Sequence, residues 1–340
     1  FHCRAGEWED TMSLFARIRT EHFEPDLVTY NTVITALGRG DQWASAIQVM
    51  EKMPLSPNTN TYNAAIHTCA SAGEWEVGMN LFHQLSSGYN QTKRKEIRPN
   101  TITYNTVIAM LAREQQSQKA LDLFQEMKEK RIPRNHISFG AAIFACEKNH
   151  PPLCWKALDL YSEMKSEGIS PKTNTLVTLF KSLLKASQPE KAYNFLLQLE
   201  EEEVDLSIIC YQVVLENCVE NDKVEWAECV FEKAKNLTKP SYVADLEYCY
   251  THMIRLRQKN GKWEEALILM KQVRSFPTRR NAYEQWYKAI SLLSDNFDTS
   301  EKITKKTYLA ALANAADSGR WEESLALIGK MKDSGMDPGS

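Results

Sequence analysis

Three asparagines in this chain follow a Thr-Tyr pair, and their amide side chains could bind a polar ligand. They are Asn31, Asn63 and Asn105. Looser versions of the phrase recur at residues 138–140, 210–212, 249–251 and 307–309. An amide offers both a hydrogen-bond donor and an acceptor, so it can pair with the Watson–Crick edge of a nucleic-acid base. Recurrence at a nearly regular spacing predicts an array of stacked repeats, each carrying one such position.

The repeats are predicted to be pairs of helices joined by a turn. We number each unit from the residue three before the aromatic residue of the phrase, so that this aromatic residue is position 4. Each unit then has a small residue at position 20 and large apolar residues at positions 24 and 27, and these positions share one helical face. Gly73, Gly261 and Gly319 mark the turn, and prolines such as Pro57 and Pro99 end the second helix. The predicted organisation is a partial repeat at 1–26, seven repeats over 27–281, an irregular helix and loop at 282–304, and a final repeat at 305–340.

The seven repeats divide the chain at unequal intervals. Their predicted bounds are 27–58, 59–100, 101–135, 136–172, 173–207, 208–246 and 247–281. The second is long because it includes a polar loop near residues 86–96. Stacked units of this kind bury their apolar faces against their neighbours, so each one depends on the next for stability.

Basic side chains recur at position 13, two helical turns from the asparagine position. They are Arg4, Arg39, Arg113, Lys148, Lys185 and Lys259. The chain as a whole has a net charge of −3, which gives no general attraction to polyanions. A basic stripe on the first helices would therefore bind phosphates locally. Scattered, solvated lysines and arginines are the alternative interpretation.

No pattern in the sequence indicates catalysis. The chain has eight cysteines but no Cys-x-x-Cys pair, and Cys69, Cys146 and Cys218 fit small, buried helix positions. There is no glycine-rich phosphate loop and no nucleophile elbow. We therefore expect no enzyme, no metal and no cofactor.

The register makes the chain resemble the pentatricopeptide repeat family. Residues 28–34 are similar to the opening helix of that family's repeat, and residues 119–128 are similar to its second helix. Tetratricopeptide repeats are the nearest rival, but they have 34 residues and a different Trp/Gly/Tyr pattern. The resemblance covers nearly all of the chain outside 282–304. It implies an all-α fold, a right-handed α-solenoid of about 35-residue helix–turn–helix repeats.

The resemblance also implies binding of single-stranded RNA, with one base read per repeat. In the family, position 5 and the last residue of a repeat read the base edge. Here these pairs are Asn31/Asn58, Asn63/Asn100, Asn105/Asn135 and Thr251/Asn281. Paired asparagines are associated with pyrimidines, so a pyrimidine-rich stretch is the expected target.

Position 2 in the family places an apolar side chain between neighbouring bases. Val28, Ile102, Ile137 and Ile209 occupy that position here. The residues alone fit ordinary packing at the start of a helix equally well. The other repeats depart from the reading pattern: Val177 and Leu309 stand where a polar reader is expected, and neither can hydrogen-bond to a base.

The predicted function is therefore non-catalytic binding of single-stranded RNA in RNA processing, stability or translation. The predicted location is the matrix or stroma of a mitochondrion or chloroplast, without membrane insertion. The alternative is a structural subunit of an organellar ribosome, RNA polymerase or other large assembly, which binds protein or RNA without reading its sequence. Intact asparagine pairs in the first three repeats favour RNA reading, and the degenerate later repeats favour the alternative.

Overall fold

The computed structural model of the protein describes residues 7–21, 23–88, 97–237 and 243–260, and residues 262, 265, 266, 268, 269, 272 and 328. The secondary structure over these residues is helical, without a β-strand. The chain divides into two compact units, residues 1–186 and 187–340. The predicted segments 282–304 and 305–340 lie outside the described residues, apart from residue 328.

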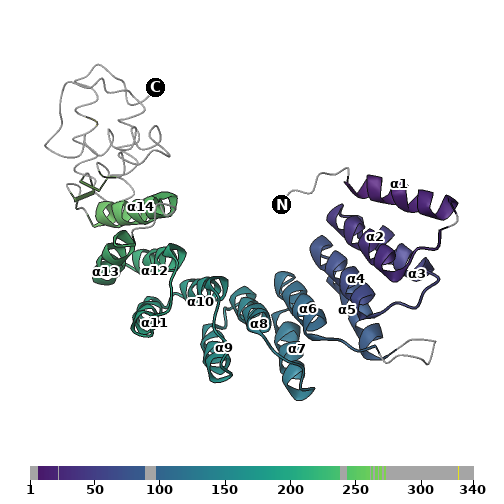
Figure 1. The fold of residues 1–340 in the computed structure, drawn as a ribbon. Coiled ribbons are helices and arrows are strands. Elements are labelled where there is room, and N and C mark those ends of the chain that lie inside the picture. Colours follow the sequence, from purple (N-terminus) through teal and green to yellow (C-terminus); the bar gives the residue numbers. More distant parts are fainter. Residues whose placement is uncertain are drawn as a thin grey trace. The chain divides into compact units, whose positions relative to one another are not determined.

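The first unit is a two-layered stack of helix pairs. Its helices are α1 (Glu7–Thr20), α2 (Leu27–Arg39), α3 (Trp43–Lys52), α4 (Thr59–Ala72), α5 (Trp75–Ser86), α6 (Thr101–Arg113), α7 (Ser117–Glu129), α8 (His136–Lys148), α9 (Cys154–Ser166) and α10 (Thr173–Lys185). Helices α2, α4, α6, α8 and α10 pack side by side as one layer, and α3, α5, α7 and α9 form the other (Figure 1). This arrangement confirms the predicted all-α repeat solenoid.

Helices α4, α6 and α8 begin at the residue that the register marks as position 1, because an asparagine caps each of them. The Oδ1 atoms of Asn58, Asn100 and Asn135 accept backbone N–H bonds from the third residue of the helix, at 2.9, 3.0 and 3.1 Å. A Thr or Ser hydroxyl at that third residue completes a reciprocal capping box. In these repeats the last residue therefore caps the first helix of the next repeat.

The aromatic ring of the Thr-Tyr-Asn phrase belongs to the core. The exposed fractions of Tyr30, Tyr62 and Tyr104 are 4%, 5% and 0%. The Tyr104 ring meets Phe82 of the preceding second helix edge to face, with centroids 5.1 Å apart, and Tyr30 meets Phe15 in the same way at 5.4 Å. The tyrosine thus joins consecutive repeats.

The turn between the two helices of a repeat is left-handed at position 15. Gly73 has a φ of +79° there, and Asp41 and Gln115 have φ values of 60° and 57° at the corresponding places. Glycine adopts this conformation without steric cost, whereas other residues do so less readily. Some of these turns are therefore formed by residues other than glycine and cannot be recognised from the glycines alone. The other two predicted turn glycines, Gly261 and Gly319, lie outside the described residues.

A buried arginine connects the third and fourth repeats. The side chain of Arg134 is 5% exposed, and its guanidinium lies 5.0 Å from the ring centroids of both Phe124 and Phe139. It pairs with Glu163 at 3.0 Å and also with Glu167. Lys128 contacts the same Glu163 at 2.6 Å.

This cluster predicts a loss of stability in acid. Burial raises the pKa of Glu163, but hydrogen bonds from Lys128 and Arg134 outweigh it, so the pKa lies below the ordinary value of 4.5. A lowered folded-state pKa contributes stability that is present above pH 4.5 and is lost as the pH falls through the folded value. We expect the urea midpoint to fall between pH 7 and pH 3, and the fall to be smaller in Glu163→Gln. An equal fall in both proteins would contradict this.

The second unit contains helices α11 (Pro189–Glu201), α12 (Ile208–Glu220), α13 (Val224–Lys235) and α14 (Val243–Lys259). Helix α12 packs against α11, α13 and α14. Helix α14 begins at Val243, before the predicted repeat start at Glu247. In the described part of the chain, no helix combines the length and apolar character that crossing a membrane requires.

Candidate nucleic-acid interface

A hollow of about 310 Å³ is lined by predicted site residues of the third repeat. They are the residues predicted to hydrogen-bond to a base edge, to insert between bases and to bind a phosphate. Helix α6 contributes Ile102, Asn105 and Arg113, and Asn135 and Ile137 come from the start of α8. Ile102 and Ile137 are 62% and 53% exposed. Side chains this exposed contribute little to packing at the start of a helix.

The amide of Asn105 is buried but incompletely satisfied. Its Nδ2 donates to Oδ1 of Asn135 at 3.2 Å, which physically joins the predicted reading pair. The residue is 7% exposed, and its Oδ1 is buried without a hydrogen-bond partner. A buried acceptor without a donor costs about 1–3 kcal/mol. A ligand N–H entering the hollow would remove that cost.

The second repeat uses its asparagine differently. Asn63 Nδ2 lies 3.5 Å from Asn100 Oδ1, so this predicted pair is also adjacent. However, Asn63 Oδ1 accepts a 2.6 Å hydrogen bond from the hydroxyl of Thr103. Thr103 is not among the predicted site residues, although its place as the third residue of a capped helix is a signal that could have indicated it.

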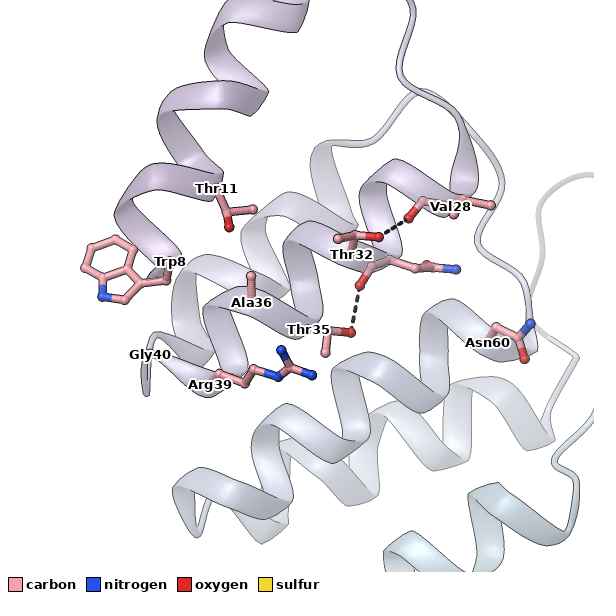
Figure 2. Close-up of a pocket in the computed structure, with 10 residues that line it drawn as sticks. Trp8, Thr11, Val28, Thr32, Thr35, Ala36, Arg39, Gly40 and Asn60 are labelled. Atoms are coloured by element: carbon pink, nitrogen blue, oxygen red, sulfur yellow. Dashed lines mark hydrogen bonds between the residues drawn. The ribbon is translucent and has the colours of Figure 1, made fainter. Parts of the chain in front are cut away.

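The first repeat forms a larger hollow, of about 500 Å³, between α1, α2 and the start of α4 (Figure 2). Val28, Asn31 and Arg39 all line it, together with Trp8 and Asn60. Val28 is 69% exposed, and Asn31 Oδ1 is buried without a partner. Asn58, the predicted reading partner of Asn31, caps α4 and does not line this hollow.

The predicted phosphate-binding residues fall into two groups. Arg39 and Arg113 are exposed at the ends of the two hollows, and no carboxylate of the described residues pairs with either. In contrast, Lys185 pairs with the buried Glu147 at 2.5 Å, and Lys259 pairs with Asp222 at 2.5 Å. These two lysines are partly neutralised. Lys148 lies 5.3 Å from the Phe144 ring centroid, and Arg4 is outside the described residues.

The second unit presents few of the predicted site residues. Ile209 is 40% exposed at the start of α12. The hydroxyl of Thr251 donates to the backbone carbonyl of Glu247 at 3.0 Å, and Asn281 lies outside the described residues. The fourth predicted pair, Thr251 and Asn281, therefore stays a prediction.

The described cysteines do not form a reactive or metal-binding group. Cys146 and Cys218 are fully buried, and burial raises the pKa of Cys218 to about 12. Within the described residues, no three His, Cys, Asp or Glu side chains are placed to hold a metal ion. The hollows on the first helices are thus the candidate site.

The fold defines an α-helical repeat protein whose first helices line the candidate hollows. Comparison with family models gives the family. The PPR repeat family model matches residues 25–71 and 99–148, the pentatricopeptide repeat domain model matches 2–40, and the PPR repeat model matches 60–87, 153–169 and 307–336. Together these matches cover more than half of the chain. The protein belongs to the pentatricopeptide repeat family.

Similar proteins come from plants. A mitochondrial pentatricopeptide repeat-containing protein of Arabidopsis thaliana is 24% identical over 163 residues, which are 48% of this chain and 20% of the relative. The chloroplastic pentatricopeptide repeat-containing protein 10 of Zea mays is 34% identical over 74 residues, or 21% of this chain and 9% of the relative. The matched region is thus only a small part of each relative.

A solved structure with a similar fold is maize PPR10 in complex with an 18-nt psaJ RNA element. Its TM-score is 0.53, with 18% sequence identity over 98% of this chain and 52% of that chain. At this identity the similarity concerns the fold. The chain spans about half the length of that structure.

Proposed function

We propose that the first unit binds single-stranded RNA without catalysis, with its first helices facing the bases. The observation that carries the proposal is the hollow around Asn105. Two exposed isoleucines flank a buried amide whose Oδ1 lacks a donor, and Arg113 lies further along the same helix. A base fits these features, because its faces are apolar, its edge has N–H donors and its phosphate is anionic.

The proposed base preference rests on the family resemblance, in which paired asparagines are associated with pyrimidines. An amide that both donates and accepts can pair with a Watson–Crick edge. The solved maize relative contains bound RNA, which supports the ligand class. Three asparagine repeats in sequence give a pyrimidine-rich target about three nucleotides long at one base per repeat.

We further propose that the protein acts in a mitochondrion or chloroplast, in the matrix or stroma, in RNA processing, stability or translation. Support comes from relatives named as mitochondrial or chloroplastic. The second candidate function is a structural subunit of an organellar ribosome, polymerase or other large assembly. The ion pairs that occupy Lys185 and Lys259 favour this alternative for the later repeats.

The test compares the two groups of basic residues by measuring binding of single-stranded RNA at several salt concentrations. We expect Arg39→Ala with Arg113→Ala to weaken binding of every sequence about tenfold and to reduce the slope of log affinity against log salt by about one to two. Lys185→Ala with Lys259→Ala should have a smaller effect, because each of these lysines already faces a carboxylate.

The outcome separates the two candidate functions. If wild-type protein binds no oligomer at low salt and instead co-purifies with a large assembly, RNA binding by the first unit is wrong and the structural role is favoured. Equal effects of the two pairs of substitutions would contradict the assignment of Arg39 and Arg113 as the phosphate-binding residues.

A further inference from the structure

The hydroxyl of Thr103 lies between two asparagine side chains. Its Oγ1 is 2.6 Å from Oδ1 of Asn63 and 3.1 Å from Oδ1 of Asn100. A hydroxyl has a single proton to donate, and the shorter contact identifies Asn63 as the acceptor. Thr103 is completely buried, and its branched side chain restricts rotation about χ1. The hydroxyl is therefore held against Asn63.

The equivalent hydroxyls in the neighbouring repeats have no such contact. Thr61 donates to Asn58 at 3.0 Å, and Ser138 donates to Asn135 at 3.2 Å. In both cases the acceptor is the residue that caps the helix. The reading asparagines of those repeats, Asn31 and Asn105, keep a buried Oδ1 without a partner.

Three asparagines in the same sequence phrase therefore show different chemistry to a ligand. In the first and third repeats the Oδ1 atom has no hydrogen-bond donor within the protein. In the second repeat Thr103 occupies Oδ1 of Asn63, and one Nδ2 hydrogen faces Asn100 Oδ1 at 3.5 Å. The bond from Thr103 uses one of the two lone pairs of Asn63 Oδ1 and fixes the orientation of the amide, so this oxygen is a weaker acceptor for a ligand while the nitrogen can still donate.

We propose that Thr103 sets the base preference of the second repeat, by holding Asn63 as a donor that favours cytosine over uracil. This rests on the proposed function. The central Watson–Crick atom of cytosine is an acceptor, N3, which the Nδ2 donor of Asn63 matches. In uracil the same atom carries a hydrogen, and a buried N–H without an acceptor is unfavourable. Thr103 acts here as a positioning residue, since it touches Asn63 and not the base.

The first experiment uses the wild-type protein. A uracil-only oligomer is compared with oligomers that carry one cytosine, placed at a different position in each. The affinity of the protein for each oligomer is measured at the same salt concentration. We expect a single position at which cytosine increases affinity by about fivefold or more, the cost of one unmatched hydrogen bond. A uniform effect of cytosine at all positions, or none, would overturn the proposal.

The second experiment uses matched variants. Thr103→Val and Thr61→Val each remove a capping-box hydroxyl, but only the first removes a contact with a reading asparagine. The cytosine preference should disappear in Thr103→Val and persist in Thr61→Val and Thr103→Ser. Persistence in Thr103→Val would overturn the role of Thr103 and leave RNA binding intact.

Failure of the proposed function and failure of the role of Thr103 give different results. If wild-type protein binds none of the oligomers, the proposed function and the role of Thr103 are both wrong. If Thr103→Val does not fold, the wild-type cytosine scan still decides, because it needs no variant. Loss of overall affinity with an unchanged cytosine-to-uracil ratio indicates a purely structural role for Thr103 and overturns the inference.

Discussion

Replacing Asn31 and Asn105 together with alanine is expected to lower affinity for a pyrimidine-rich oligomer roughly a hundredfold, since each lost base contact is worth about 1–3 kcal/mol. Both side chains line hollows, and both have a buried Oδ1 without a protein partner. Neither caps a helix, so the double variant should remain folded. The measurement is equilibrium binding of pyrimidine and purine oligomers of equal length at one salt concentration.

The controls separate base contact from general effects. Asn80 and Asn194 are exposed on second helices, and their replacement with alanine should leave affinity unchanged. Asn100→Ala is a poor test of reading, because Asn100 caps α6 and its loss costs about 1 kcal/mol of stability. An unchanged ratio of pyrimidine to purine affinity in the double variant would refute base reading by these two residues.

Replacing Tyr104 with alanine is expected to destabilise the first unit by about 3–5 kcal/mol, the usual cost of removing a buried aromatic ring. The ring is completely buried, and its edge-to-face contact with Phe82 joins the second and third repeats. The hydroxyl donates to Glu126 at 2.9 Å. Urea unfolding followed by circular dichroism should show a lower midpoint.

Two further variants test whether, in the Thr-Tyr-Asn phrase, the tyrosine provides stability and the asparagine binds RNA. Tyr104→Phe keeps the ring and should lose only about 1 kcal/mol, from the hydrogen bond to Glu126. Asn105→Ala should keep the wild-type midpoint and lose affinity for RNA. If Tyr104→Ala unfolds at the wild-type urea concentration, the ring does not couple the repeats as we describe.

Much of the fold could be predicted because its signals are local. The position-20 residues Ala46, Gly78, Ala120 and Ala157 are buried where the register places a close approach of helices. A Cβ on Gly78 would lie 2.6 Å from the Met110 sulfur, so no larger residue fits without movement. Helix α14 differs from the prediction, because it begins at Val243 and not at Glu247.

The candidate site could be predicted in part. Helical spacing was sufficient to place Asn105, Arg113 and Ile102 on one face of α6, since residues three, four and seven to eight apart share a face. It was insufficient for Lys185, whose partner Glu147 is on the preceding first helix. Basic residues at the same position 13 therefore differ in whether a carboxylate neutralises their charge.

By itself the sequence determined which residues form helices, where most first helices begin and which ring is buried, because helix caps and apolar periodicity act over a few neighbouring residues. Only the tertiary structure decided what each asparagine presents. Asn63 and Asn105 stand in the same phrase, but Thr103 occupies Oδ1 of Asn63 while Oδ1 of Asn105 has no partner. That difference depends on how closely consecutive repeats approach, and hydrogen bonds between residues about 40 positions apart form only when the stacked helices bring them together.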